Sequence, residues 1–193
     1  MIPYYKIFVS NEGFIQRISN YGINKKIIIF SPQWIPSEIN FSNYKQKFLK
    51  SKKMNFTFAG NIGKVQNLEI IIKSFSEMNA TSTLNIIGDG SNLENLKKLV
   101  RNNNFTNINF FDRKPINEIS NWLVSSDILI ISLKDEDAFN LTVPAKFQAY
   151  LGAKKPILSI IGGETSRLVS KYNLGYCANP SSKEDIKKKI QKF

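Results

Sequence analysis

The sequence predicts an α/β fold with a doubly wound parallel sheet, in which helices cover both faces of the sheet. Three observations lead to this prediction. From residue 54 onward, short apolar segments alternate with amphipathic segments of helical length. The connections between them are short, which is typical of parallel βαβ units. The chain has 193 residues, 42% of them hydrophobic, and is therefore long enough to bury one sizeable core.

The expected strands are short apolar runs. They are residues 54–59, 83–87, 108–111, 127–132, 156–161 and a short strand near Tyr176. The expected helices lie between these strands and carry apolar residues three and four positions apart. The first of them has Leu68, Ile71, Ile72, Phe75 and Met78 on one face. The others are expected at 93–100, 116–123, 144–151 and 164–171, with a lysine-rich helix from Ser182.

The first 50 residues have a different organisation. Two short strands, at 6–10 and 26–30, flank a helix at 12–21 that ends before Gly22. A polar, basic connection follows. One and a half βα units are too few to form a core of their own, so we expect two parts, residues 1–50 and residues 51–193.

The chain is strongly basic, with a formal net charge of +12 and few arginines among its 27 basic residues. The lysines cluster at 45–53 and 183–192. Such a surface suits nucleic acid, anionic lipid or a phosphorylated substrate, and it also fits a general compositional bias. The scarcity of arginine argues against sequence-specific DNA reading, which relies on bidentate Arg contacts.

Two residue types exclude other functions. The chain has no histidine, which rules out a His-based catalytic triad. Its single cysteine, Cys177, allows no intrachain disulfide, and together with the missing histidines it argues against a zinc site. No signal peptide and no membrane-spanning apolar run is visible, and the expected compartment is the cytoplasm.

The first candidate site lies in the stretch 56–67, where an apolar strand, a glycine-containing turn and an amphipathic helix follow one another. This arrangement leaves backbone N–H groups free at a helix N-terminus beside a lysine, which suits a phosphate. In parallel α/β sheets, ligands bind beyond the carboxyl ends of the strands. The candidate residues are Gly60, Asn61, Gly63 and Lys64. The simpler interpretation is a solvated lysine in a tight turn.

The connection after the strand at 127–132 gives a second candidate site. Lys146 is placed in the first turn of a helix, where a cation opposes the helix dipole and a bound anion would compensate. The preceding residues would offer backbone N–H groups to a phosphate or a sugar, and they are Asn140, Leu141, Thr142 and Val143. An exposed helix lysine preceded by an ordinary loop is the alternative.

In their order and spacing these segments resemble the C-terminal, donor-binding half of a GT-B glycosyltransferase of the retaining family 4. The similarity is carried by Ser10-Asn11-Glu12-Gly13-Phe14, Gly60-Asn61-Ile62-Gly63-Lys64, Gly88-Asp89-Gly90, Val143-Pro144-Ala145-Lys146 and Gln148-Ala149-Tyr150-Leu151. The last two resemble a branch that builds bacterial surface polysaccharides. Two departures are visible. Asn61 and Gln66 stand where the family usually has Arg and Lys, and Leu141 and Ala149 stand where it has paired glutamates.

The resemblance implies a Rossmann-like donor domain at 51–193, with residues 1–50 as a remnant of the acceptor domain and the interdomain linker. It implies transfer of a sugar, with amino sugars among the candidates, from a nucleoside diphosphate sugar, expected to be UDP-linked. The implied acceptor is a polysaccharide or lipid-linked glycan, and the implied outcome is retention without a metal or other cofactor. Gly60, Asn61, Gly63, Lys64 and Lys146 would hold the donor diphosphate.

In the family, the loop that carries Arg113 and Lys114 here holds the nucleotide base. An acceptor-domain chain is the implied partner, together with peripheral contact at the inner face of an anionic membrane. No catalytic residue is identified. Two other interpretations stay open: a half-enzyme or truncated fragment that only binds the nucleotide sugar, and a basic module that binds a membrane or nucleic acid.

Overall fold

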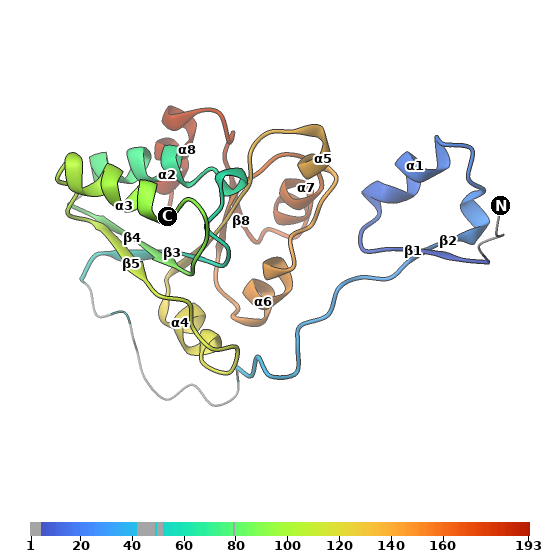
Figure 1. Ribbon diagram of the computed structural model, residues 1–193, viewed down its shortest axis with the longest axis horizontal. Helices are drawn as coiled ribbons and strands as arrows, with labels where there is room; N and C mark the ends of the chain where they lie inside the picture. Colours follow the sequence, from blue (N-terminus) through green and yellow to red (C-terminus); the bar gives the residue numbers. More distant parts are fainter. Residues whose placement is uncertain (1–4, 42–48, 50–51, 79) are drawn as a thin grey trace.

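The computed structural model describes residues 5–41, 49, 52–78 and 80–193. Its main feature is a six-stranded sheet with the order β5-β4-β3-β6-β7-β8, in which all neighbouring strands are parallel (Figure 1). The strands are β3 (Met54–Ala59), β4 (Ser82–Ile87), β5 (Ile108–Phe111), β6 (Ile128–Ser132), β7 (Ile157–Ile160) and β8 (Gly175–Cys177). The predicted parallel sheet is confirmed.

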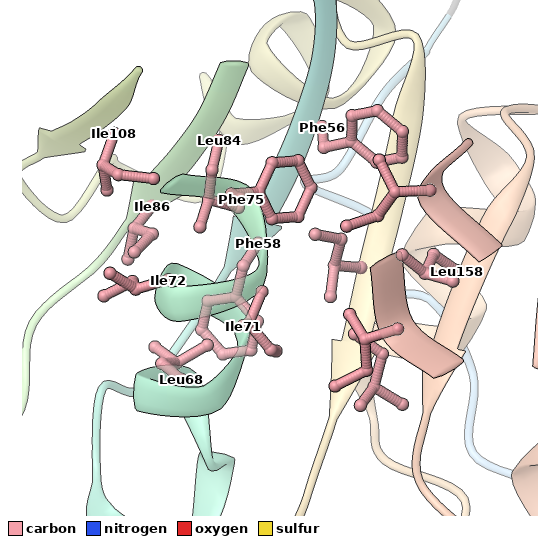
Figure 2. Close-up of a cluster of buried hydrophobic side chains, with 14 of the residues drawn as sticks. Phe56, Phe58, Leu68, Ile71, Ile72, Phe75, Leu84, Ile86, Ile108 and Leu158 are labelled. Carbon is pink, nitrogen blue, oxygen red and sulfur yellow. The ribbon is translucent and has the colours of Figure 1, made fainter. Parts of the chain in front are cut away.

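Helices cover both faces of this sheet. One face packs against α2 (Leu68–Phe75), α3 (Leu93–Asn102) and α8 (Lys183–Ile190), and the other against α4 (Ile119–Ser125), α6 (Lys146–Gly152) and α7 (Gly163–Lys171). Successive side chains of a strand point to opposite faces. Ile128 and Ile130 of β6 therefore join the first core cluster, part of which Figure 2 shows, whereas Leu129 and Ile131 join the second. The doubly wound arrangement is confirmed.

The strand order reverses between β3 and β6. The chain leaves β3 for β4 on one side of the sheet and later returns to β6 on the other side. These two strands pair only at Phe56↔Ile128 and Thr57↔Leu129, so their ladder stops before their carboxyl ends. Such a reversal is where open α/β sheets bind their ligands, because the connections on its two sides diverge.

Residues 5–30, here called the N-terminal lobe, form a separate parallel pair of strands, β1 (Ile7–Val9) and β2 (Ile28–Phe30). Helix α1 (Gly13–Ser19) and the 3-10 turn η1 (Lys25–Ile27) connect the two strands. The lobe contacts the helices of the six-stranded sheet through Glu12, whose carboxylate lies 3.5 Å from the Arg167 guanidinium of α7. The boundary between the two parts at residue 50 stays a prediction.

The structure differs from the expected elements near the carboxyl ends of two strands. A 3-10 turn, η2 (Lys64–Gln66), precedes α2, and Asn67 joins them with a left-handed φ of 54°. The connection after β6 contains a short helix, α5 (Asp137–Asn140), where the sequence predicted only a loop. Helix α6 begins at Lys146, two residues after Pro144. No helix in the described part of the chain combines the length and apolarity needed to cross a bilayer.

Candidate functional site

The turns after β3 and β4 are locked together by backbone hydrogen bonds. The Ile62 N–H donates to the Asp89 carbonyl at 2.8 Å, and the Asn92 N–H donates to the Ile62 carbonyl at 3.0 Å. Gly88 has a φ of +145°, and a Cβ there would lie 1.9 Å from the Gly60 carbonyl oxygen. Glycine is therefore required at Gly88 by both conformation and space. The turn containing Gly60 is held on a rigid base.

The first candidate residues lie on this turn with unequal availability. Asn61 and Lys64 are exposed, and Lys64 forms no ion pair with any described residue. The Gly63 N–H donates to Gln66 Oε1 at 2.9 Å, so this group is already engaged. The turn thus presents the Lys64 ammonium and the Asn61 amide to solvent, where both are free to meet a ligand.

Lys146 reaches the same turn from the other side of the strand reversal. Its Nζ lies 3.6 Å from the ring centroid of Phe58, a fully buried residue of β3. The same Nζ would lie 2.9 Å from a Cβ at Gly60. The absence of a side chain at Gly60 is therefore what leaves room for the lysine amine. The structure brings Gly60 and Lys146 together, and the anion site that the resemblance implies for both residues stays a prediction.

The Lys146 amine is buried and unpaired. Its Nζ is shielded from solvent and has no hydrogen-bond partner within the described residues. Burial lowers the pKa of Lys146 from 10.5 to about 7, because the charged ammonium loses its hydration. A buried lysine without a carboxylate is costly, and a bound anion would restore both its charge and its hydrogen bonds. The geometry therefore suits a diphosphate group.

Sequence reasoning missed two buried polar residues, one on the helix of this lysine and one at the end of β6. Tyr150 lies one turn further along α6, and its hydroxyl accepts a hydrogen bond from the Ala59 N–H at 3.0 Å. Burial raises the pKa of this phenol well above its ordinary value. Ser132 ends β6, and its buried Oγ has no partner in the part of the chain described. A small polar residue closing the apolar run of β6 was the only sequence signal for it.

The loop after β6 uses most of its own backbone N–H groups. The N–H groups of Asn140 and Thr142 donate to the carbonyls of Glu136 and Phe139. They are therefore not free for a ligand, in contrast to the sequence-based expectation. Val143 is buried, and Leu141 contacts the N-terminal lobe at Gly13. The side-chain Oδ1 of Asn140 is shielded and unpaired among the described residues. This oxygen is therefore the group of the loop that could accept a hydrogen bond from a ligand.

The predicted base-binding residues follow β5, next to the turn of Gly88. The Gly88 N–H donates to the Phe111 carbonyl at 3.0 Å, which ties the two turns together. Arg113 is exposed, whereas the Lys114 amine lies 4.7 Å from the Trp122 ring centroid. Arg113 is thus available to a ligand, and Lys114 is held over an aromatic ring. The described residues contain no group of three or more acidic, Cys or His side chains arranged to hold a metal.

Comparison with known sequences gives two matches. The sequence model of the family described as glycosyl transferases group 1 matches residues 40–193. WbjE of Pseudomonas aeruginosa, a probable glycosyltransferase, is 29% identical over 167 residues. That similarity covers 85% of this chain and 40% of WbjE.

Comparison with solved structures gives the same fold. A glycosyltransferase from Rickettsia africae superposes with a TM-score of 0.77 at 17% identity, over 97% of this chain and 52% of that protein. Anabaena Alr3699/HepE, solved in complex with UDP and glucose, has a TM-score of 0.72 at 12% identity, over 97% of this chain and 53% of that protein. The chain therefore spans about half the length of these structures and less than half of WbjE.

Proposed function

The chain belongs to the glycosyl transferases group 1 family as a GT-B C-terminal domain, and from this premise we propose that it is the donor-binding half of a retaining hexosyltransferase. The donor is a nucleoside diphosphate sugar, UDP-linked, and the acceptor is a polysaccharide or a lipid-linked glycan. In the transfer, the bond between the anomeric carbon and the phosphate oxygen breaks. The acceptor hydroxyl forms the new bond and loses its proton, and the nucleoside diphosphate leaves.

The observation that carries this proposal is the position of Lys146. Its unpaired amine lies beneath Gly60 at the strand reversal, where an open α/β sheet receives its ligand. A diphosphate placed there would also reach the exposed Lys64 on the same turn. Two ammonium groups would then offset the negative charge that grows on the leaving diphosphate, without a metal ion. Arg113 on the neighbouring turn would stack on the base.

Calorimetric titration with UDP, GDP, ADP, dTDP and NAD tests this proposal on the wild type and three variants. Lys64→Ala and Lys146→Met should each weaken binding of the preferred diphosphate by roughly tenfold or more, as expected for a charge-assisted contact of about 1.5–3 kcal/mol. Lys188→Ala removes the same charge from an exposed position of α8 and should leave binding unchanged. Absence of binding to every nucleotide would refute the donor-site proposal.

An acceptor-binding domain completes the enzyme in this proposal. The N-terminal lobe exposes large apolar side chains, with Phe8 67% and Trp34, just beyond the lobe, 82% accessible. If these side chains form one contiguous patch, that patch would be a surface for protein contact. Co-expression with the N-terminal half of a homologous enzyme should yield a complex that transfers sugar, whereas this chain alone should only bind the donor. Transfer by this chain alone would remove the need for a partner.

The basic-module alternative has less support in the structure. Of the lysine cluster at 45–53, only Lys52 and Lys53 fall within the described residues. On α8, Lys183 and Lys187 both pair with Glu77, which neutralises part of that helix's charge. Peripheral attachment to an anionic membrane fits the remaining lysines and would accompany donor binding. Co-sedimentation with phosphatidylglycerol vesicles that disappears at about 0.5 M salt, where the Debye length falls to roughly 4 Å, would support this attachment.

A further inference from the structure

Asn11 is a buried polar residue without a role in the site described above. It follows β1 in the N-terminal lobe and is only 4% exposed. Neither its Nδ2 nor its Oδ1 has a hydrogen-bond partner within residues 5–41, 49, 52–78 and 80–193. An amide has two donor hydrogens and an acceptor oxygen, so burying it unpaired is unfavourable. A buried, unsatisfied polar group in a native structure has a specific cause, such as a functional role or a bound water or ion.

The position of Asn11 connects it to the donor side of the molecule. Its Oδ1 and the Leu141 carbonyl oxygen lie 3.3 and 3.5 Å from the position that a Cβ of Gly13 would occupy. The turn between β1 and α1 therefore sits directly on the loop after β6. The neighbouring Glu12 lies 3.5 Å from the Arg167 guanidinium of α7, which adds a surface ion pair between this turn and that helix.

The loop on which Asn11 rests has a second unsatisfied amide. Asn140 donates through Nδ2 to Asp135 at 3.1 Å, but its Oδ1 has no partner in the described structure. Gly162 and Gly163 pack against Asn140 so closely that a Cβ on either would clash with it, so the side chain is held in place. Unsatisfied amide atoms of Asn140 in this loop and of Asn11 in the turn that packs on it therefore lie close together along the chain segment that precedes the helix carrying Lys146.

We propose that Asn11 is a sugar-binding residue, which hydrogen-bonds a hydroxyl group of the transferred sugar. This inference rests on the proposed function, because it places the sugar next to the diphosphate at Lys146. A sugar hydroxyl both donates and accepts hydrogen bonds, which matches the two kinds of atom that an amide offers. An uncharged amide also suits a neutral sugar better than an anion. The N-terminal lobe then takes part in reading the donor sugar, and the donor domain holds the nucleotide.

A comparison of sugar-bearing and sugar-free donors tests this role. The affinities of UDP, UDP-glucose and UDP-N-acetylglucosamine are measured by calorimetry on the wild type, Asn11→Ala and Asn11→Leu. Both variants should bind UDP like the wild type and bind at least one UDP-sugar about 5- to 10-fold more weakly, as expected for one lost hydrogen bond. Asn20→Ala, at the exposed end of α1, is the matched control and should change neither affinity.

The outcomes separate this inference from the proposed function. Asn11→Leu keeps the side-chain volume and removes no internal hydrogen bond, so its Tm should equal or exceed that of the wild type. Equal loss of UDP and UDP-sugar affinity, or a fall in Tm for both variants, would assign Asn11 a structural role and overturn the inference. Unchanged affinity for every UDP-sugar would overturn it as well. Failure of the wild type to bind UDP would instead refute the proposed function.

Discussion

The Lys146 side chain differs from most lysines in that its amine, and not only its aliphatic stem, is shielded from solvent. Lysines commonly bury their aliphatic stem and keep the ammonium in water. Here the residue as a whole is partly exposed, whereas its Nζ is shielded against the Phe58 ring and the Gly60 backbone. Nothing in the packing of the core requires an amine at this place. A lysine held in an unfavourable state at the carboxyl ends of parallel strands is therefore best explained by the anion that it would bind.

The pKa of Lys146 predicts how the stability of the free protein depends on pH. The amine has a pKa of about 7 in the folded protein and 10.5 as its ordinary value. Between these values the unfolded chain binds more protons, so the free energy of unfolding rises with pH. From pH 7 to pH 9, wild-type stability in urea should increase relative to Lys146→Met by up to about 1.4 kcal/mol per pH unit. Lys188→Met should run parallel to the wild type, and a pH-independent difference for Lys146→Met would contradict this.

The affinity for the donor should depend on protonation of the same amine, but it should fall with rising pH where the free energy of unfolding rises. The diphosphate prefers the charged amine, so binding takes up a proton above pH 7, where the free lysine is neutral. UDP-glucose is the appropriate probe because its diphosphate lacks the second phosphate ionisation near pH 6. Its affinity should be constant below pH 7 and fall above it, by up to about tenfold per pH unit. A flat profile between pH 7 and pH 9 would show that Lys146 does not contact the donor.

Gly60 and Gly88 should differ in how they respond to the addition of a methyl group. Both have positive φ, but the neighbour of Gly60 is the mobile end of Lys146, whereas that of Gly88 is the backbone of Gly60. Truncating Lys146 to alanine should therefore reduce the stability cost of Gly60→Ala by about 1 kcal/mol, a typical coupling between contacting residues. The cost of Gly88→Ala should be the same in both backgrounds. Denaturant unfolding of Lys146→Ala, the two single glycine variants and the two double variants measures these values, and additivity at Gly60 would argue against the contact.

At the scale of elements, helix α6 compensates for the short pairing between β3 and β6. The ladder between these strands includes Phe56 and Thr57 but not Ala59, whose N–H is satisfied by the Tyr150 hydroxyl instead. Tyr150 and Lys146 are four positions apart and so lie on one face of α6. Helix α6 thus binds Ala59 at the end of β3 through Tyr150, and it places the Lys146 amine next to the following residue, Gly60.

Removal of the Tyr150 hydroxyl should loosen this attachment. Tyr150→Phe leaves the buried Ala59 N–H without its partner, which costs about 1–2 kcal/mol and lowers Tm by roughly 2–8 °C for a chain of this size. UDP affinity should fall as well, because α6 carries Lys146. Tyr172→Phe is a suitable control, since that ring is exposed and its loss of a hydroxyl should leave Tm unchanged. An unchanged Tm for Tyr150→Phe would show that α6 is held by packing alone.

The elements that the sequence predicted best are those with a strong local pattern. The helical spacing from Leu68 to Phe75 and the apolar run of β6 identified their elements directly. Helix α5 has a single turn, and its last residue, Asn140, packs closely against Gly163 of α7. Local pattern cannot reveal such tertiary contacts. The contact between Lys146 and Phe58 is equally invisible to local pattern, because the two residues are 88 positions apart in the sequence.

At the scale of the whole molecule, the two lobes contribute unequally to the folded core. Both core clusters consist mainly of residues from the six-stranded sheet, its helices and their connections, and the earliest described residue packed against them is Phe41. The N-terminal lobe has its own small buried pair, Val9 and Ile28. It therefore adds contact surface at the loop after β6 but little to the stability of the sheet.

Deletion of the lobe should separate stability from sugar recognition. A chain that begins at Ser31 keeps Phe41 and every described core residue of the sheet, so its Tm and UDP affinity should match those of the full chain. It loses Asn11 and the Glu12–Arg167 contact, so the difference in affinity between UDP-glucose and UDP should become that of Asn11→Ala. Calorimetry and thermal unfolding of both chains provide the comparison. A large fall in Tm would mean that the lobe shares the core, whereas an unchanged sugar preference would mean that the donor domain reads the sugar by itself.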